Sequence, residues 1–221
     1  MSKQKDRFEN YNKLNTCWNL WYHNPNNNNW ELDSYQDFIF FTTIEEFWNI
    51  YKGYIEIDNK DQNKLQNIDL KTDQNPENNA INYINEFLIQ NGMFFMMRDS
   101  TKPIWEDDQN CMGGCWSYKV DKKDVYRVWI ELSAKIISED TVDDEHWDLI
   151  NGISISPKKT FSIIKIWVSK NIQEIKPNVD DIYILNSADV IYRAHVSNIE
   201  KHKTRMKQIN AKKNQYKNKK F

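Results

Sequence analysis

Seven short stretches of the chain either alternate apolar and polar residues or are rich in aromatic residues. Successive side chains of a β-strand point to opposite faces of a sheet, so these stretches predict strands with at least one buried face. The predicted strands cover residues 18–22, 35–41, 93–97, 115–120, 153–156, 161–168 and 188–196.

Two segments between these strands have the apolar spacing of helices. In residues 43–51, Thr43 and Glu46 form the pattern of a capping box, which predicts a helix start. The apolar residues of this segment recur at the spacing of one helix face: Ile44, Phe47, Trp48 and Tyr51. A second helix is predicted over residues 124–138, with an apolar stripe of Val125, Val128, Trp129, Leu132 and Ile136.

The second helix carries a surplus apolar stripe on another side, formed by Ile130, Ala134 and Ile137. A helix that packs on one face of a sheet needs only one such stripe. The surplus stripe therefore indicates either an exposed contact surface or a neighbouring loop that covers it, and the sequence leaves both open.

The order of these elements predicts an α+β domain, in which helices pack on the convex face of a single curved antiparallel sheet. A polar insertion is predicted over about residues 58–90, and the end of this region, residues 77–92, has the pattern of a helix that stops at Gly92. The predicted organisation is a flexible N-terminal arm (1–13), one folded domain (14–200) and a basic C-terminal tail (201–221).

The charge of the chain is unevenly distributed. The last 21 residues contain nine Lys or Arg and no acid, so the first 200 residues carry 21 basic and 32 acidic residues, a net charge of −11. An acidic body with a basic tail fits a protein that touches a polyanion locally, and a solvated helix or a frayed terminus explains the tail at least as well.

Several function classes are not indicated by the sequence. No long apolar run predicts a membrane span, and the first residues lack the apolar segment of a secretory signal. Three cysteines suit reduced thiols in the cytosol, and the C-x3-C pair Cys111 and Cys115 has no nearby histidine to complete a metal site. No cofactor motif is present. We attribute the asparagine run at residues 26–29 to compositional drift.

Nine tryptophans mark the chain, and Trp105 has an unusual setting. It stands in "KPIWEDDQN", directly before Glu106, Asp107 and Asp108, which places a flat aromatic ring beside carboxylates. The other motifs follow in a fixed order along the chain: "CWNLWY", Trp30 after a polar loop, "TIEEFWNIY", "PIWEDDQN", "GGCW", "VWIEL" and "IKIWV". Together they resemble the cap-binding eukaryotic translation initiation factor 4E family over roughly residues 14–169.

The resemblance implies a slot for the 7-methylguanosine cap of mRNA on the concave face of the sheet. Methylation at N7 makes this base cationic, and a cationic ring stacks best on electron-rich indole, at about 1–3 kcal/mol for each stack. By the resemblance, Trp30 and Trp105 stack on the base, Glu106 accepts hydrogen bonds from its N1–H and N2–H groups, and Trp167 contacts the N7-methyl group.

This chain has only some of the basic residues that the family uses to bind the cap phosphates. Lys158 falls at a family arginine position, whereas Thr160 and Ile163 fall where lysines are usual, and Cys115 replaces the arginine that often follows the Gly-Gly pair. The local replacements are Lys159, and Lys165, which shares strand parity with Trp167. We expect Lys158, Lys159 and Lys165 to hold the phosphates.

The resemblance also implies a partner surface on the helical side, which binds a Tyr-x4-Leu-Φ helix of a scaffold factor of the 4G type or of a 4E-binding repressor. The residues that match the family pattern at this surface are Leu14, Ile44, Trp48, Ile130, Glu131 and Ala134. Ala134 stands where a leucine is usual, which predicts a smaller groove. The protein is expected to be a monomer outside its complex and to lie in the cytoplasm, or in the host cytoplasm if it is viral.

The function expected from these features is non-enzymatic recruitment of capped mRNA for translation initiation. A cap-binding repressor would use the same slot with other partners, and the sequence does not separate the two. A general single-stranded RNA-binding module would use aromatic platforms without cap specificity. A carbohydrate-active enzyme would need Glu106 and Asp108 as an acid and base pair, but these acids lie too close together in one turn. The remaining tryptophans at positions 18, 21, 116, 129 and 147 are expected to lie in the core.

Overall fold

A computed structural model of the chain describes residues 11–52, 84–186, 189–197, 199–200 and 204. The predicted arm, most of the predicted tail and most of the predicted insertion lie outside these residues. The described strands are β1 (Lys13–His23), β2 (Tyr35–Thr43), β3 (Met93–Arg98), β4 (Gly114–Asp121), β5 (Ile150–Pro157), β6 (Phe161–Val168) and β7 (Ile191–Ala194). The helices are α1 (Ile44–Lys52), α2 (Glu86–Asn91), α3 (Val125–Ile137) and two 3-10 helices, Leu32–Ser34 and Asp144–Leu149.

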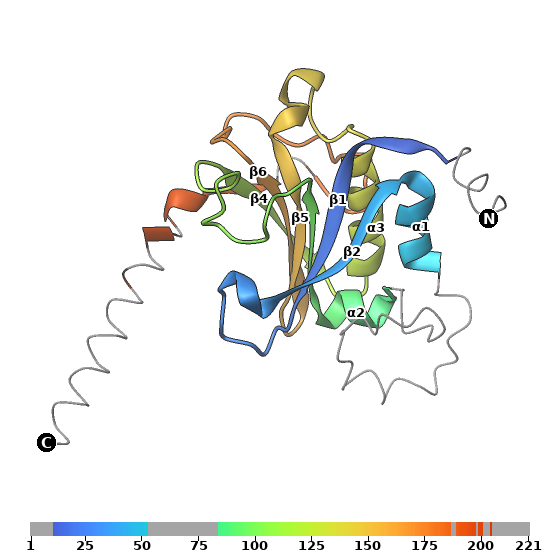
Figure 1. Cartoon of the computed structure of the whole chain (residues 1–221), viewed down its shortest axis with the longest axis horizontal. Helices are drawn as coiled ribbons and strands as arrows, with labels where there is room; N and C mark the ends of the chain where they lie inside the picture. Colours follow the sequence, from blue (N-terminus) through green and yellow to red (C-terminus); the bar gives the residue numbers. More distant parts are fainter. Residues whose placement is uncertain (1–10, 53–83, 187–188, 198, 201–203, 205–221) are drawn as a thin grey trace, which may run out of the picture.

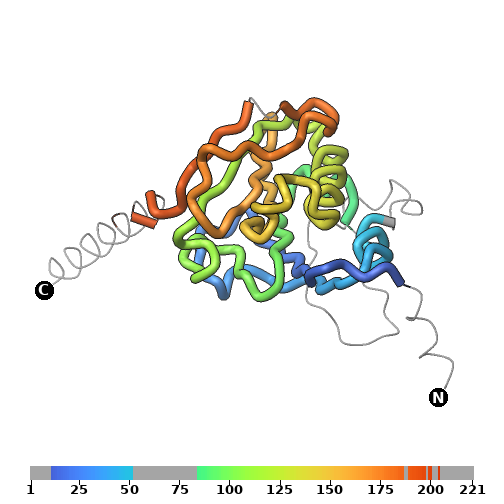
Figure 2. Tube along the Cα trace, turned by 90° about the horizontal axis from the view of Figure 1, so that it is seen from above, coloured from blue at the N-terminus to red at the C-terminus, as the bar shows by residue number. Residues whose placement is uncertain are grey.

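The seven strands form one antiparallel sheet in the order β2-β1-β3-β5-β6-β4-β7. Figure 1 shows α1, α2 and α3 together on one side of this sheet, and Figure 2 shows the same arrangement from above. The predicted α+β class, the curved sheet and its helical layer are confirmed, and each of the seven predicted strands overlaps one of these strands.

The main core lies between the sheet and the helices. Alternate strand residues such as Trp18, Met96 and Ile166 face this side and are fully buried. The predicted stripe of α3 packs against them: Val125, Val128, Trp129, Leu132 and Ile136 have no exposed area. Burying each of the four aliphatic side chains of this stripe contributes about 1.5–3 kcal/mol, so this layer holds the sheet to its helices.

The capping box of α1 forms as predicted. The backbone N–H of Thr43 donates to the Glu46 carboxylate at 3.1 Å, and the N–H of Glu46 donates to Thr43 Oγ1 at 3.2 Å. These bonds fix the helix start directly after β2. Phe47 and Tyr51 face the core, whereas Ile44 and Trp48 remain about 40% exposed, so the predicted single stripe is divided between the core and the surface.

The last part of the insertion predicted over residues 58–90 belongs to the folded domain, and the rest of it lies outside the described residues. Ile84 and Ile89 are fully buried in the main core, and α2 begins after Asn85, whose side chain accepts a hydrogen bond from the N–H of Leu88. Gly92 ends this helix as predicted. Residues 84–91 are therefore part of the domain and not of a surface insertion; within residues 77–92 the described helix is confined to α2.

Candidate functional sites

The face of the sheet away from the helices carries a second, smaller aromatic cluster. The odd-parity residues of the central strands form it, because neighbouring residues of a strand face opposite sides. Its buried members are Trp21, Met93, Phe95, Met97 and Trp167, with Tyr35 and Trp105 packed against them. Five members of this cluster, Tyr35, Met93, Phe95, Trp105 and Trp167, line a cavity of about 500 Å³. The cavity also reaches Trp30, Glu106, Ser154, Ser156, Lys158 and Lys165.

Trp105 is held at this cavity by a loop whose anchor is Asn110. The buried side chain of Asn110 donates to the carbonyl oxygens of Lys102 and Ile104, at 2.8 and 2.9 Å. Its Oδ1 accepts a bond from Asn151 on β5 at 2.8 Å. A hydrogen bond between neutral groups contributes about 1 kcal/mol to stability. Together these bonds fix the Trp105 loop, which is not paired with a strand.

Trp30 enters the cavity from the loop between β1 and β2. Its ring stacks on His23, with the ring centroids 4.5 Å apart and the planes 9° from parallel, while the residue stays 45% exposed. The loop is closed by asparagine side chains: Asn24, Asn27 and Asn29 each accept a hydrogen bond from the backbone N–H two residues on. Asn27 and Asn29 of the asparagine run therefore shape this loop, and the attribution of the run to compositional drift stays an interpretation.

Glu106 lies beside Trp105 and gives the cavity a negative end. Burial raises the pKa of the Tyr35 hydroxyl, and the charge of Glu106 raises it further, so this carboxylate lies near the cavity floor. Two cations lie nearby: the ammonium of Lys165 is 5.9 Å from the centre of the Trp105 ring, and Lys158 lines the cavity from the β5–β6 turn. Lys159 is exposed in the same turn, but it is not among the lining residues.

Trp167 is positioned from two sides. Its indole N–H donates to Ser154 Oγ at 2.8 Å across the β5–β6 pair. His195 packs on it with a centroid separation of 4.8 Å, and the Nδ1 of His195 lies 2.8 Å from the carbonyl oxygen of Asn110. Because a carbonyl only accepts, Nδ1 carries the proton. His195 thus links the Trp105 loop to the floor of the cavity.

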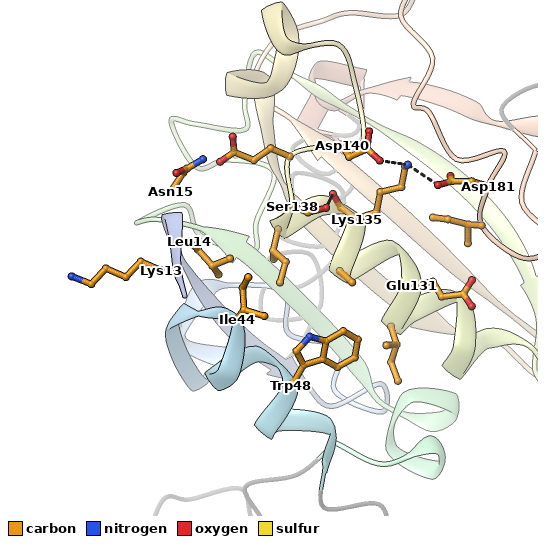
Figure 3. Close-up of a pocket in the computed structure, with 15 residues that line it drawn as sticks. Lys13, Leu14, Asn15, Ile44, Trp48, Glu131, Lys135, Ser138, Asp140 and Asp181 are labelled. Carbon is orange, nitrogen blue, oxygen red and sulfur yellow. Dashed lines mark hydrogen bonds and ion pairs between the residues drawn. The ribbon is translucent and has the colours of Figure 1, made fainter. Parts of the chain in front are cut away.

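A second cavity, of about 660 Å³, lies on the helical side of the molecule (Figure 3). All six residues expected at the partner surface line it: Leu14, Ile44, Trp48, Ile130, Glu131 and Ala134. Ile130 and Ala134 are only partly buried, so this part of the surplus stripe of α3 is accessible, whereas Ile137 is 7% exposed.

The polar residues of this groove are held by ion pairs. The buried ammonium of Lys135 lies 2.6 Å from Asp140 and 2.9 Å from Asp181, which joins the end of α3 to a distant loop (Figure 3). Glu131 accepts hydrogen bonds from Arg127 and from the backbone N–H of Tyr183, so it is already oriented by the protein. The sequence patterns did not reveal the pair of Lys135 with Asp181, because the two residues are 46 positions apart in the chain.

The structure thus brings together Trp30, Trp105, Glu106, Trp167, Lys158 and Lys165 from separate segments and leaves Lys159 outside their cavity. The five tryptophans expected in the core are all buried, although Trp21 belongs to the smaller cluster and not to the main core. No cluster of His, Cys, Asp or Glu among the described residues could hold a metal ion. None of the described helices has the length and apolarity to cross a membrane.

A single curved sheet with helices on one side and an aromatic cavity on the other defines a small class of α+β binding proteins. The model of the family "Eukaryotic initiation factor 4E" matches residues 13–210. The chain belongs to this family.

The chain is also similar, at low sequence identity, to individual proteins of this family. The chain is 27% identical over 180 residues to eukaryotic translation initiation factor 4E of Candida albicans, which covers 78% of this chain and 71% of that protein. It is also 27% identical over 166 residues to the Saccharomyces cerevisiae factor, which covers 73% of this chain and 63% of that protein.

Solved structures share the fold. A complex of C. elegans eIF4E-3 with the 4E-binding protein Mextli and a cap analog matches with a TM-score of 0.59 and 20% identity, covering 86% of this chain and 96% of that one. A Schistosome eIF4E complexed with m7GpppG and 4E-BP matches with a TM-score of 0.54 and 21% identity, covering 75% and 76%. These likenesses establish the common architecture.

Proposed function

We propose that this protein binds the 7-methylguanosine cap of mRNA in the aromatic cavity and takes part in translation initiation. One observation carries the proposal: Trp30, Trp105 and the carboxylate of Glu106 line the same cavity. Trp30 and Trp105 lie on two loops and are 75 residues apart in the sequence. Family membership supports it, as do the cap analogs named in the related complexes.

In this proposal the cationic base lies between Trp30 and Trp105. The ammonium of Lys165, now near the Trp105 ring, gives way to the base, since a delocalised cation that can stack is favoured at an indole face. Glu106 accepts the N1–H and N2–H bonds, which are worth about 1.5–3 kcal/mol because the acceptor is charged. Trp167 faces the N7-methyl group from the floor, with its ring fixed by Ser154.

The phosphates extend from the base toward Lys158 and Lys165. Both line the cavity, so they are the stronger candidates, and Lys159 acts at longer range from the same turn. No catalytic step is proposed, because the role of the site is recognition. The basic tail, outside the described residues except for Thr204, remains a candidate contact to RNA beyond the cap.

The groove on the helical side is proposed to bind a helix of a 4G-type scaffold or of a 4E-binding repressor. Trp48 offers a ring that is 40% exposed, and Leu14, Ile44 and Ile130 supply apolar neighbours. A repressor role uses the same slot and the same groove, so the partner and not the cap decides between activation and repression. The site of action is the cytoplasm, where capped mRNA is translated.

Tryptophan fluorescence with 7-methyl-GTP and plain GTP tests the cap slot. We expect quenching by 7-methyl-GTP at concentrations where GTP has little effect, and the Trp105→Ala variant should lose about 10- to 100-fold in affinity, the worth of one stack. Trp48→Ala is the matched control, because it removes an exposed tryptophan on the other side of the sheet. Equal responses to both nucleotides would overturn the proposal and favour a general RNA-binding module.

A further inference from the structure

Arg193 lies on the same face of the sheet as the proposed cap slot, at the outer strand β7. It is directly opposite Cys115 on β4, and Cys115 is directly opposite Trp167 on β6. Residues opposite one another in neighbouring strands point to the same face, so Trp167, Cys115 and Arg193 form one row. With strands about 4.8 Å apart, Arg193 lies about 10 Å from Trp167 along this row.

The charge of Arg193 is available to a ligand. The residue is exposed, and within the described part of the chain its guanidinium makes no ion pair. Lys165 stands in the adjacent row, opposite Ser117. Burial raises the pKa of the Cys115 thiol, and the positive charges of Lys165 and Arg193 oppose this rise, so both cations act on the strip of sheet between them.

We propose that Arg193 binds phosphate oxygens of the cap that lie farthest from the base, and that it takes over the role of a cation missing at position 115. This inference rests on the proposed cap slot. A guanidinium presents several donors that match phosphate geometry. Lys165 is near Trp105 and therefore near the base, whereas Arg193 is two strands beyond Trp167, so a chain of phosphates that leaves the slot across β4 meets Lys165 first and Arg193 afterwards.

The test compares 7-methyl-GMP, 7-methyl-GTP and a capped oligonucleotide on wild type and Arg193→Gln. We expect the variant to bind 7-methyl-GTP about three- to tenfold more weakly, as for a solvent-exposed charged contact, with 7-methyl-GMP unaffected. The slope of log affinity against log salt for the capped oligonucleotide should become shallower by roughly one. Lys123→Gln removes an equally charged side chain, 79% exposed and remote from the slot, and should change neither quantity.

A charge-conserving variant strengthens the test. Arg193→Lys keeps a cation at the same place in the row and should retain most of the affinity for 7-methyl-GTP that Arg193→Gln loses. Loss of 7-methyl-GMP and 7-methyl-GTP binding to the same extent in Arg193→Gln would overturn the inference, as would no loss of either. If wild type does not distinguish 7-methyl-GMP from GMP, the proposed function fails as well, which separates the two failures.

Discussion

His195 is a fully buried histidine beneath the proposed cap slot, and its imidazole must remain neutral for the native structure to be stable. Its side chain has no exposed area, its Nδ1 is bonded to the Asn110 carbonyl, and its Nε2 has no hydrogen-bond partner among the described residues. A second proton on this ring would place a charge in a site with no acceptor for it, which is costly.

The pH dependence that follows has a definite sign. The pKa of His195 is lowered to about 4, chiefly by burial and to a smaller extent by the nearby charge of Lys165, whereas the Asn110 bond and Glu106 partly oppose the shift. The unfolded chain has a histidine pKa of about 6.5, so below that pH it binds a proton that the native state does not. The contribution of His195 to the free energy of unfolding is therefore constant above about pH 6.5. It falls as the pH decreases and levels off below about pH 4. At about pH 5 the loss is about 2 kcal/mol.

Urea unfolding at about pH 7.5 and about pH 5 measures this loss. The His195→Asn variant keeps a donor for the Asn110 carbonyl but cannot titrate, so its free energy of unfolding should fall by about 2 kcal/mol less than that of wild type between these conditions. An identical decrease in wild type and His195→Asn would refute the reasoning.

Two further predictions concern the surfaces on either side of the sheet. Trp48→Ala should lower the affinity of a helical Tyr-x4-Leu-Φ peptide by at least about tenfold while 7-methyl-GTP binding stays unchanged, measured by calorimetry; retained peptide binding would remove the groove from the proposal. Replacing Lys158, Lys159 and Lys165 together by glutamate should weaken 7-methyl-GTP far more than 7-methylguanosine. Among single glutamine variants, Lys159 should matter least because it does not line the cavity; unchanged affinity in the triple variant would show that other cations hold the phosphates.

The strands and the main helices could be predicted because their signal is local. Every strand of this sheet has at least one apolar face, and the central ones are buried on both, so their aromatic and β-branched runs stand out from the polar loops. The stripe of α3 was visible for the same reason. The start of α2 was not, because the helical pattern of residues 77–92 does not single out Asn85, which caps α2, from the other asparagines of this stretch.

The support of the site was less predictable than the residues proposed to touch the ligand. Trp105 and Glu106 stand out by their own sequence setting, but Asn110 looks like part of an acidic turn. Its role depends on Asn151 and His195, which are more than 40 residues away. Similarly, the stacking of Trp30 on His23 joins a loop to the end of β1, and no periodicity in the sequence predicts that pair.

The alternation of the sheet explains how one thin domain can carry two binding surfaces. Ile166 and Trp167 are neighbours on β6, yet Ile166 is part of the core beneath the helices and Trp167 is part of the floor of the slot. The two cavities have no lining residue in common, and α1 and α3 line the groove on the helical side without reaching the slot. A ligand in the slot changes the groove only if it moves the strands themselves. Because the sheet is packed on both faces, such movement is costly, and the two sites can be occupied together.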